Sequence, residues 1–375
     1  MRGRVPGSGL NPHLLFWAGS GTWYDDPPVP EPVTPARDFG DPAPSERRSG
    51  LVCGRFLPPH AGHRFVLDVA RQSAGHLTAL IFASKSDPIP AAWRAAWLRE
   101  MCPGVQVGIV DADALPDDAA PDFVQRAAAL VREHVPDGVD DLFASDLSAV
   151  PLAEHLKATF VPVDPARRQV PISGSELRAD VMAGWHFLPE VVRPWFVRRV
   201  AIIGPFGSGK STLAERLADY FDTVAVPEVA RAIAEGRSGA LRPADVQPAA
   251  RGQVAQEEAL ARRANRILIC DTSLTQLCLW SAELFRTCPP WIEALDRARP
   301  YDLTLITPAR SGTTQETNFR ARCVDEARVL GRPFVPLQGS FDECFSAACE
   351  AIEAMQARRG LIGARFEAEA ASSLP

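Results

Sequence analysis

The chain has 375 residues, which is long enough for two domains of ordinary size, each with its own hydrophobic core. Its 40 Lys and Arg residues against 46 Asp and Glu residues give a formal net charge of −6, and this balance argues against a nucleic-acid or anionic-membrane surface. No apolar run approaches the roughly 18 to 20 residues of a membrane span, and the N-terminus lacks the pattern of a secretory signal, so we expect a cytoplasmic protein with small-molecule substrates.

The two ends of the chain differ in composition from the rest. Residues 1–48 are rich in proline, with Gly, Ser, Asp and Glu between the prolines. Such a segment buries too little apolar surface to offset the entropy lost on ordering, so we predict a disordered tail there and a second tail at residues 359–375. The eight cysteines are scattered without a CxxC pair or zinc-ligand spacing, and we expect reduced thiols.

Short apolar runs alternate with helical patterns through residues 49–184, which we predict to form the first domain. Apolar residues at intervals of three and four predict helices. The expected strands are 51–53, 77–83, 105–110, 141–144 and 158–163, and the expected helices are 63–74, 91–101 and 121–135. Strands that alternate with helices are typical of a doubly wound parallel sheet.

The same alternation restarts near residue 200, and we predict a second domain over residues 200–358. Its expected strands are 198–204, 266–270, 301–307 and 334–339, and its expected helices are 210–221 and 342–359. Residues 185–199 are rich in aromatics and poor in Gly and Ser, which predicts a packed linker. The fold class expected is therefore α/β, with two doubly wound parallel-sheet domains.

The segment GPFGSGKST, residues 204–212, has the G-x4-G-K-[ST] spacing of a phosphate-binding P-loop. Glycines leave the backbone N–H groups free to close around phosphate oxygens at a helix N-terminus. Lys210 would reach the β- and γ-phosphates, and Ser211 would ligate Mg²⁺. The alternative is an incidental glycine turn, but the position between an apolar strand and a helix argues against it. The expected nucleotide-binding residues are Gly204, Gly207, Ser208, Gly209, Lys210, Ser211 and Thr212.

Two later segments could complete a P-loop site. Asp271 ends the apolar run RILIC, and a carboxylate there could hold Mg²⁺, although an Asp in this position can also cap a helix. In AVPEVAR, Glu228 could accept a proton from a hydroxyl substrate and Arg231 could bind a phosphate or a ribose. A solvated helix start explains Glu228 and Arg231 equally well. Glu228 is thus a candidate catalytic base.

In the first domain, the segment CGRFLPPHAGH at 53–63 places Gly54, His60, Gly62 and His63 between the first strand and the first helix. Two imidazoles at a helix N-terminus suit the binding of a polyphosphate and the stabilisation of a departing pyrophosphate. HxGH alone is a weak pattern, and it becomes specific together with Gly54, Phe56 and Pro58 at these spacings.

The segment ISGSELRAD at 172–180 offers a second helix N-terminus in the same domain. Its hydroxyls and the arginine of its helix could bind another side of a triphosphate, and on its own the segment is an ordinary capped helix. The expected contacts there are Ser173, Gly174, Ser175 and Arg178.

At these motifs the sequence resembles the HxGH nucleotidyltransferase superfamily. The combination with a following P-loop kinase resembles the bifunctional NadR family, which joins nicotinamide-nucleotide adenylyltransferase to ribosylnicotinamide kinase. The resemblance covers about residues 50–355 and is most specific in the segment VDPARRQVPISGSELRADVMAGWHFLPEVVRPWFVRRVAIIGPFGSGKSTL at 163–213. PEVAR and CDTSLTQ are similar to the family's glutamate and arginine pair and to its Asp-Thr segment.

The resemblance implies an HxGH domain that makes NAD and pyrophosphate from nicotinamide mononucleotide (NMN) and ATP, and a kinase domain that makes NMN from nicotinamide riboside. It implies ATP and Mg²⁺ as cofactors, and either Glu228 or Asp271 as the base of the kinase. In the HxGH domain it implies charge stabilisation by His60, His63 and Arg178, nucleotide contacts from Arg55 and Phe56, and pyridine-nucleotide contacts from Arg94 and Trp97.

Three points depart from the family or leave alternatives. Residues 1–48 cannot form the DNA-binding domain that some members carry, so no nucleic-acid partner is expected. The family's usual lid motif is replaced at 308–322, where Glu316, Arg320 or Arg322 could substitute. The alternatives are an HxGH transferase of the pantetheine-phosphate or cytidylyl type fused to another metabolite kinase, and a nucleotide sensor with degenerate catalysis. The sequence leaves homo-oligomerisation open.

Overall fold

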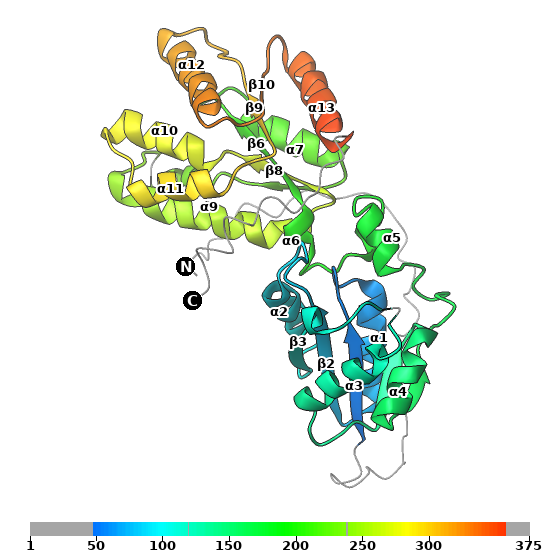
Figure 1. The fold of residues 1–375 in the computed structure, drawn as a ribbon. Helices are drawn as coiled ribbons and strands as arrows, with labels where there is room; N and C mark the ends of the chain where they lie inside the picture. The colour runs from blue at the N-terminus through cyan, green and yellow to red at the C-terminus, as the bar shows by residue number, and fades with distance from the viewer. Residues whose placement is uncertain (1–47, 119, 238, 358–375) are drawn as a thin grey trace, which may run out of the picture. The chain divides into compact units, whose positions relative to one another are not determined.

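The computed structural model describes residues 48–118, 120–237 and 239–357. The predicted tails at 1–48 and 359–375 therefore lie almost entirely outside the described residues. Within these ranges the strands form two five-stranded sheets in which every named strand pair is parallel (Figure 1). This confirms the predicted α/β fold class with two parallel-sheet units.

The first sheet has the order β3-β2-β1-β4-β5. The reversal of direction beside β1 places the carboxyl ends of β1 and β4 at the kind of crevice where open α/β sheets bind ligands. The strands are β1 (Ser49–Gly54), β2 (His76–Ala83), β3 (Gln106–Asp111), β4 (Asp141–Ala144) and β5 (Thr159–Pro162), and the helices are α1 (Ala61–Ser73), α2 (Ala91–Met101), α3 (Phe123–His134), α4 (Val150–Leu156) and α5 (Gly174–Ala179).

The second sheet has the order β10-β9-β6-β8-β7, with the glycine loop following its central strand. The strands are β6 (Arg198–Ile203), β7 (Val224–Val226), β8 (Ile267–Asp271), β9 (Leu303–Ile306) and β10 (Phe334–Pro336). The helices are α7 (Lys210–Tyr220), α8 (Val229–Glu235), α9 (Val246–Ala261), α10 (Leu274–Phe285), α11 (Pro290–Ala298), α12 (Thr314–Val329) and α13 (Phe341–Ala357). Four short 3₁₀ segments and the one-turn helix α6 (Arg193–Phe196) complete the elements of the described ranges.

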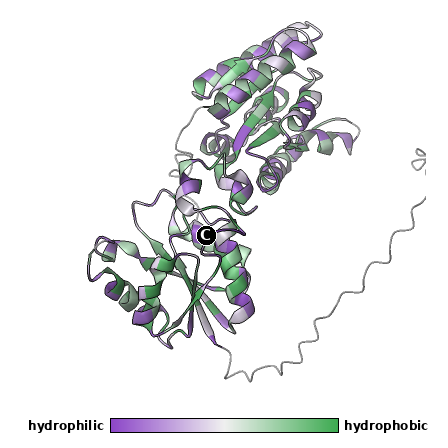
Figure 2. Cartoon of the chain, turned by 90° about the vertical axis from the view of Figure 1, so that its right-hand side faces the viewer, coloured by the Kyte–Doolittle hydropathy of each residue, from purple (hydrophilic) through white to green (hydrophobic). Residues whose placement is uncertain are grey.

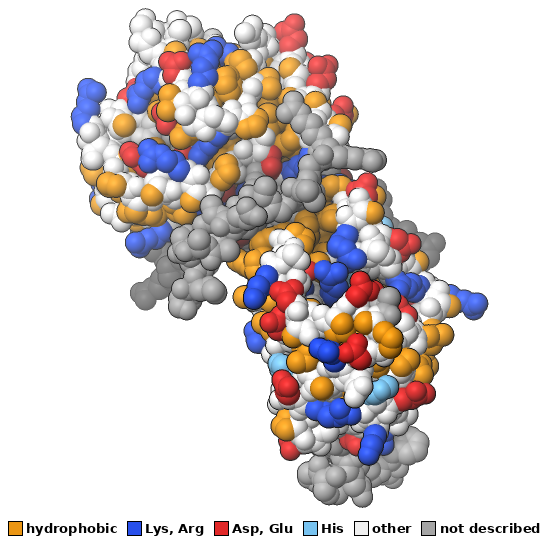
Figure 3. All heavy atoms as spheres, viewed as in Figure 1, with side chains coloured by type: hydrophobic (Ala, Val, Ile, Leu, Met, Phe, Trp, Pro, Cys, Tyr) orange, Lys and Arg blue, Asp and Glu red, His pale blue; other side chains and the backbone are white. Residues whose placement is uncertain are grey.

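Each sheet consists of largely apolar strands and is covered by helices. Figure 2 shows this as a concentration of hydrophobic residues on the strands. In the second sheet, Val200 and Ile202 of β6 pack with Leu213 and Leu217 of α7 in one buried cluster. Burial of such side chains stabilises by roughly 1.5–3 kcal/mol each. On the face of the molecule drawn in Figure 3, acidic and basic side chains are interspersed.

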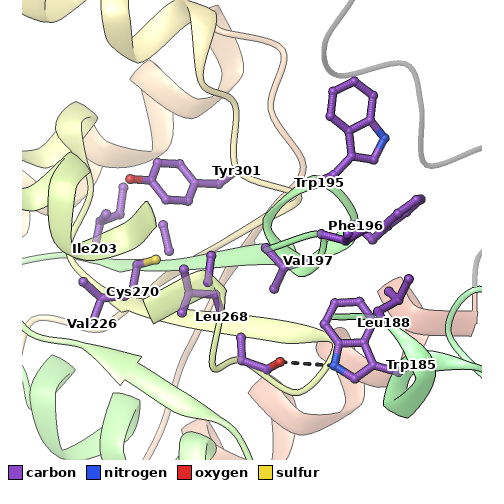
Figure 4. Packing of buried hydrophobic residues seen from close by; sticks show 14 of the residues in the cluster. Trp185, Leu188, Trp195, Phe196, Val197, Ile203, Val226, Leu268, Cys270 and Tyr301 are labelled. Carbon is purple, nitrogen blue, oxygen red and sulfur yellow. Dashed lines mark hydrogen bonds between the residues drawn. The ribbon is translucent and has the colours of Figure 1, made fainter. Parts of the chain in front are cut away.

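The segment 185–199 is packed. Trp185, Leu188, Trp195 and Phe196 are all buried in one hydrophobic cluster (Figure 4). The indole Nε1 of Trp185 donates to the carbonyl oxygen of Ala264 at 3.2 Å, so the ring is fixed by a polar contact as well as by burial. No helix in the described ranges is both long and apolar enough to cross a membrane.

All nine expected strands are present, with ends shifted by at most three residues. Helix α1 begins two residues before the expected start, because the side chain of His60 caps it. The helices α8 to α12 were not predicted. Helix α12 is polar on nearly all sides, and its buried face consists only of Phe319, Cys323 and Ala327. Its apolar periodicity is therefore too weak to predict a helix from the sequence.

Candidate functional site

Each sheet places a helix N-terminus beside its central strand, and the first of these is the HxGH turn. The imidazole Nδ1 of His60 accepts from the Gly62 N–H at 3.1 Å, and Nδ1 of His63 accepts from the His60 N–H at 3.2 Å. These reciprocal bonds hold the two rings with centroids 3.7 Å apart. Because each Nδ1 is used as an acceptor, each neutral ring carries its proton on Nε2.

Both histidines are kept neutral. Burial, with help from Arg167 and Arg178, lowers the pKa of His60 to about 4. Burial also holds the pKa of His63 well below its ordinary value, and the neighbouring His60 adds to this effect. At neutral pH the turn therefore presents two uncharged Nε2–H donors, while the positive charge nearby comes from the arginines.

The two motifs of the first sheet meet at this turn. A Cβ built on Gly174 would lie 3.2 Å from an Arg178 nitrogen and 3.8 Å from Nε2 of His60, so these side chains surround Gly174. Arg178 donates to the carbonyl oxygen of Leu57 at 3.0 Å, which ties α5 to the turn. Ser173 caps α5 by accepting from the Glu176 N–H, and its hydroxyl lies 3.0 Å from that of Ser175.

A small cavity of about 160 Å³ opens here, lined by His60, His63 and Gly174 together with Ser145 and Arg167. The guanidinium of Arg167 donates to the carbonyl oxygen of Ile172 at 3.1 Å. Sequence reasoning missed Arg167 as a candidate site residue. The signal was present in VDPARRQV, where Asp164 accepts three backbone N–H groups and folds the segment toward the cavity.

The expected substrate contacts at α2 lie deeper than the sequence suggested. Arg94 is fully buried, donating to the Arg55 carbonyl oxygen at 2.7 Å and to the Asp87 carboxylate at 2.9 Å. Asp87 also pairs with the exposed guanidinium of Arg55. Trp97 is buried against Trp195, with ring centroids 5.7 Å apart. Arg94 is thus placed to position Arg55 through Asp87, and its role toward a substrate stays a proposal.

Phe56 and Gly54 pack in the same turn. Phe56 is 1% exposed, has a φ of +48°, and places its ring 4.8 Å from that of His63. Its side chain lies where a Cβ on Gly54 would come within 3.5 Å. Because the ring of Phe56 is enclosed, a nucleotide contact from this residue would have to come from its backbone or through His63, and it stays a prediction.

The glycine loop after β6 is held by the end of β9. Gly204 has a φ of +146°, and its N–H donates to Oε1 of Gln276 at 2.7 Å. The Ser208 hydroxyl donates to the Pro205 carbonyl oxygen and lies 2.7 Å from the Thr307 hydroxyl. Ser208 is therefore occupied within the loop. The exposed Thr212 lies in the first turn of α7 beside Ser211.

Lys210 is curled back into the loop. Its ammonium donates to the carbonyl oxygens of Pro205 at 2.9 Å and Gly204 at 3.3 Å. Burial lowers the pKa of Lys210, while the carboxylates of Glu228 and Asp271 oppose that shift. A buried ammonium with only carbonyl partners is suited to binding an anion.

Four side chains from three elements gather in front of Lys210. The Ser211 hydroxyl donates to Oδ2 of Asp271 and accepts from Arg231, and Arg231 also pairs with Glu228 at 2.7 Å. The second oxygen of Asp271, Oδ1, is buried and has no hydrogen-bond partner among the described residues. A buried carboxylate oxygen left over beside a hydroxyl fits a divalent cation, so Ser211 and Asp271 are the residues that would hold Mg²⁺.

A cavity of about 720 Å³ opens beside this cluster. Its polar end is lined by Lys210, Ser211, Glu228 and Arg231, and its apolar walls are lined by Leu241, Ala249, Leu274, Leu277, Trp280 and Leu284. Burial raises the pKa of Glu228, against the opposing effect of Lys210 and Arg231. A volume of this size, with apolar walls and a few convergent polar groups, is typical of a small-molecule site.

The segment 308–322 contributes differently from what we expected. Glu316 accepts from Ser311 at the start of α12, Arg320 donates to the Leu337 carbonyl oxygen, and Arg322 pairs with Glu283. Arg310, which the sequence analysis did not single out, instead donates from Nε to the Ser208 carbonyl oxygen at 3.1 Å. Its guanidinium also lies 3.1 Å from where a Cβ on Gly209 would stand. Arg310 is thus the arginine of this segment that lies against the P-loop.

This chain is similar in sequence to a family model and to two named proteins, each over part of its length. Residues 199–342 match a family model described as an AAA domain. The trifunctional NAD biosynthesis/regulator protein NadR of Escherichia coli (strain K12) is 31% identical over 172 residues, 44% of this chain and 42% of that protein. The protein of the same name from Salmonella typhimurium (strain LT2) is 32% identical over 157 residues, 41% of this chain and 38% of that protein. The matched part thus spans less than half of either relative.

Two solved structures extend the likeness to both sheets. A NadR protein in complex with NAD and AMP-PNP superposes with a TM-score of 0.70 and 18% identity, covering 84% of this chain and 98% of that one. A NadR protein in complex with NR gives a TM-score of 0.68, also at 18% identity, and covers 84% and 97% of the two chains. Over 84% of its length, this chain has the fold of those NadR structures.

Proposed function

We propose that the chain is a bifunctional NAD salvage enzyme of the cytoplasm. The kinase unit would phosphorylate nicotinamide riboside to NMN with ATP, and the HxGH unit would adenylylate NMN with a second ATP. Support comes from the two sites described above, from the names of the two curated relatives, and from the ligands named for the two NadR structures.

In the kinase unit, the 5′-hydroxyl of the riboside would attack the γ-phosphorus of ATP. The bond from the γ-phosphorus to the β–γ bridging oxygen breaks, ADP leaves, and Glu228 receives the hydroxyl proton. Burial raises the pKa of Glu228, which makes this carboxylate a better proton acceptor than an exposed one. Asp271 is already engaged by Ser211, so Glu228 is the base that we propose.

The remaining kinase groups would bind and orient the phosphates. Lys210 donates to the β- and γ-phosphate oxygens after leaving its loop carbonyls, and Arg231 and Arg310 flank the phosphate loop. When bound at Ser211 and Asp271, Mg²⁺ would supply positive charge beside the same oxygens. Positioning and charge stabilisation account for most of the catalysis in phosphoryl transfer.

In the HxGH unit, a 5′-phosphate oxygen of NMN would attack the α-phosphorus of the second ATP. The bond to the α–β bridging oxygen breaks, and NAD and pyrophosphate form without a protein nucleophile. The Nε2–H groups of His60 and His63 donate to oxygens of the triphosphate, and Arg178 balances the charge that develops on pyrophosphate.

The observation that carries the proposal is the cluster of Ser211, Asp271, Arg231 and Glu228 at the polar end of a cavity large enough for a nucleoside. The test is chromatographic. The purified chain is incubated with MgATP and either nicotinamide riboside or NMN, and ADP, pyrophosphate and NAD are followed over time. NAD formed from the riboside through an NMN intermediate would support both activities.

Lys210→Ala separates the two steps. We expect phosphorylation of the riboside to fall by about 100- to 1000-fold because a preorganised phosphate donor is lost. NAD formation from NMN should stay within about twofold, since the HxGH residues are untouched. The matched control is Lys157→Ala, which replaces an exposed lysine at the end of α4. If neither substrate gave NAD, the salvage function would be wrong, and ligand binding would decide between another metabolite and a nucleotide sensor.

A further inference from the structure

Two glutamines on neighbouring helices line the large cavity of the kinase unit. Gln253 lies on α9 and is 3% exposed, and Gln276 lies near the start of α10 and is 1% exposed. Glutamine is an uncommon residue at such burial unless both ends of its amide are hydrogen-bonded.

Backbone groups fix which way each amide points. The Val229 N–H donates to Oε1 of Gln253 at 3.1 Å, and the Gly204 N–H donates to Oε1 of Gln276 at 2.7 Å. An N–H donor must meet the oxygen of an amide, so the NH₂ group of each glutamine faces the other way. Neither Nε2 has a hydrogen-bond partner among the described residues.

An unpaired buried donor is unfavourable, because the group has lost water without gaining an acceptor. The cavity that both glutamines line offers a place for an acceptor that the protein does not itself provide. Val229 directly follows Glu228, so the bond from its N–H also places Gln253 next to the proposed base. Gln253 and Ala249 lie one turn apart on α9 and both line the cavity.

We propose that Gln253 is a specificity-determining residue of the kinase site, whose amide NH₂ donates to an acceptor oxygen of the nucleoside substrate. The proposal rests on the kinase function above and deepens it. The acceptor is either a sugar hydroxyl oxygen or the carboxamide carbonyl oxygen of the pyridine ring. A nucleoside that lacks this oxygen leaves the amide unpaired, and the site discriminates against it.

Gln253 gives a sharper test than Gln276. Gln276 also accepts from the first glycine of the P-loop, so its replacement would disturb ATP binding together with substrate binding. The Oε1 bond of Gln253 involves only the start of α8, away from the P-loop backbone. Gln253→Met keeps the length of the side chain, and Gln253→Glu keeps the acceptor for Val229 while removing the donor.

The experiment measures kcat/KM for nicotinamide riboside, its 2′-deoxy and 3′-deoxy analogues, and the riboside of unsubstituted pyridine, with the full chain and MgATP. Equilibrium binding of ATP to each variant reports whether the kinase unit is folded. Gln256→Met, on the exposed side of α9, is the matched control. For the wild type we expect one analogue to be about 10- to 1000-fold poorer than the parent riboside.

The deciding quantity is the ratio of kcat/KM for nicotinamide riboside to kcat/KM for that poorer analogue. In Gln253→Met and Gln253→Glu this ratio should fall to within about threefold of one, mainly because activity on the parent riboside is lost. Gln256→Met should keep the wild-type ratio. A change confined to a deoxy analogue assigns the acceptor to the sugar, and a change confined to the pyridine riboside assigns it to the carboxamide. Unchanged ratios in folded variants would overturn the proposal. A wild type that phosphorylates none of the four nucleosides would instead refute the kinase function.

Discussion

Replacing Gly204 by alanine should destabilise the kinase unit far more than the same change at Gly207, three residues away. A Cβ on Gly204 would stand 2.2 Å from the Thr307 hydroxyl oxygen and 3.2 Å from its backbone nitrogen and oxygen. Thr307 cannot retreat, because its N–H and hydroxyl are bonded to the Ile203 carbonyl oxygen and its hydroxyl contacts Ser208.

The expected loss follows from two contributions. The φ of +146° at Gly204 costs an alanine roughly 1–2 kcal/mol, and the forced overlap adds about 1–3 kcal/mol, so the sum is about 2–5 kcal/mol of unfolding free energy. Gly207, with a φ of +71°, has nothing within 4 Å of its built Cβ, so Gly207→Ala carries only the backbone cost of about 1 kcal/mol.

Hydrogen exchange read by mass spectrometry measures this without nucleotide, which removes the loop's binding role from the comparison. Amides of β6 and β8 should exchange at least about 30-fold faster in Gly204→Ala than in the wild type, and less than about tenfold faster in Gly207→Ala. Peptides from β1 and β2 serve as the internal reference. Equal protection of β6 in the two variants would refute the close contact with Thr307 as the reason for a glycine at position 204.

The remaining predictions concern pH and the P-loop arginine. The pKa of His60 is about 4 in the folded protein against 6.5 for an ordinary histidine, so the unfolded chain binds the proton more readily. The contribution of His60 to stability is therefore nearly constant above about pH 6.5 and is lost as the pH drops toward 4, by about 2 kcal/mol between pH 7 and 5, and the buried His63 adds a loss of the same sign. Urea titrations should show this slope, and His60→Asn should make it shallower; an equal slope in the variant would contradict the assignment. Arg310→Ala should raise KM for ATP in riboside phosphorylation roughly tenfold or more by removing a guanidinium beside the P-loop, without changing NMN adenylylation; an unchanged KM would mean that Arg310 only supports the loop.

Sequence alone predicted the features that depend on neighbours in the chain. Inner strands such as β6 and β8 are buried on both faces and are continuous apolar runs, and the more exposed edge strands are short apolar runs between helical patterns. For these reasons β1 to β6 and β8 to β10 could be found without tertiary information. The glycine loop and the HxGH turn could also be found, because each is a pattern of a few consecutive residues whose spacing is fixed by the backbone geometry of a phosphate-binding turn. The gathering of Ser211 and Asp271 was expected from the P-loop pattern, in which a later apolar strand ends in a carboxylate that can hold Mg²⁺. The structure adds that the strands concerned, β6 and β8, are adjacent.

Tertiary structure decided what distant segments do to one another. Nothing local in α2 says that Arg94 is enclosed with Asp87 and that Trp97 packs on Trp195, because those partners come from other elements. Nothing in the sequence distinguished Arg310, which contacts the P-loop, from the other arginines of the segment 308–322, which contact residues outside the P-loop.

The two cavity glutamines show the limit most clearly. A glutamine in a helical pattern is ordinarily a solvated residue, and only the folded chain reveals that one end of the amide is held by a backbone N–H from another segment. The sequence by itself determined the type of chemistry that the motifs predict. The burial of a side chain and its hydrogen-bond partners depend on the whole packed unit, so the tertiary structure decided which side chains are left to contact a substrate.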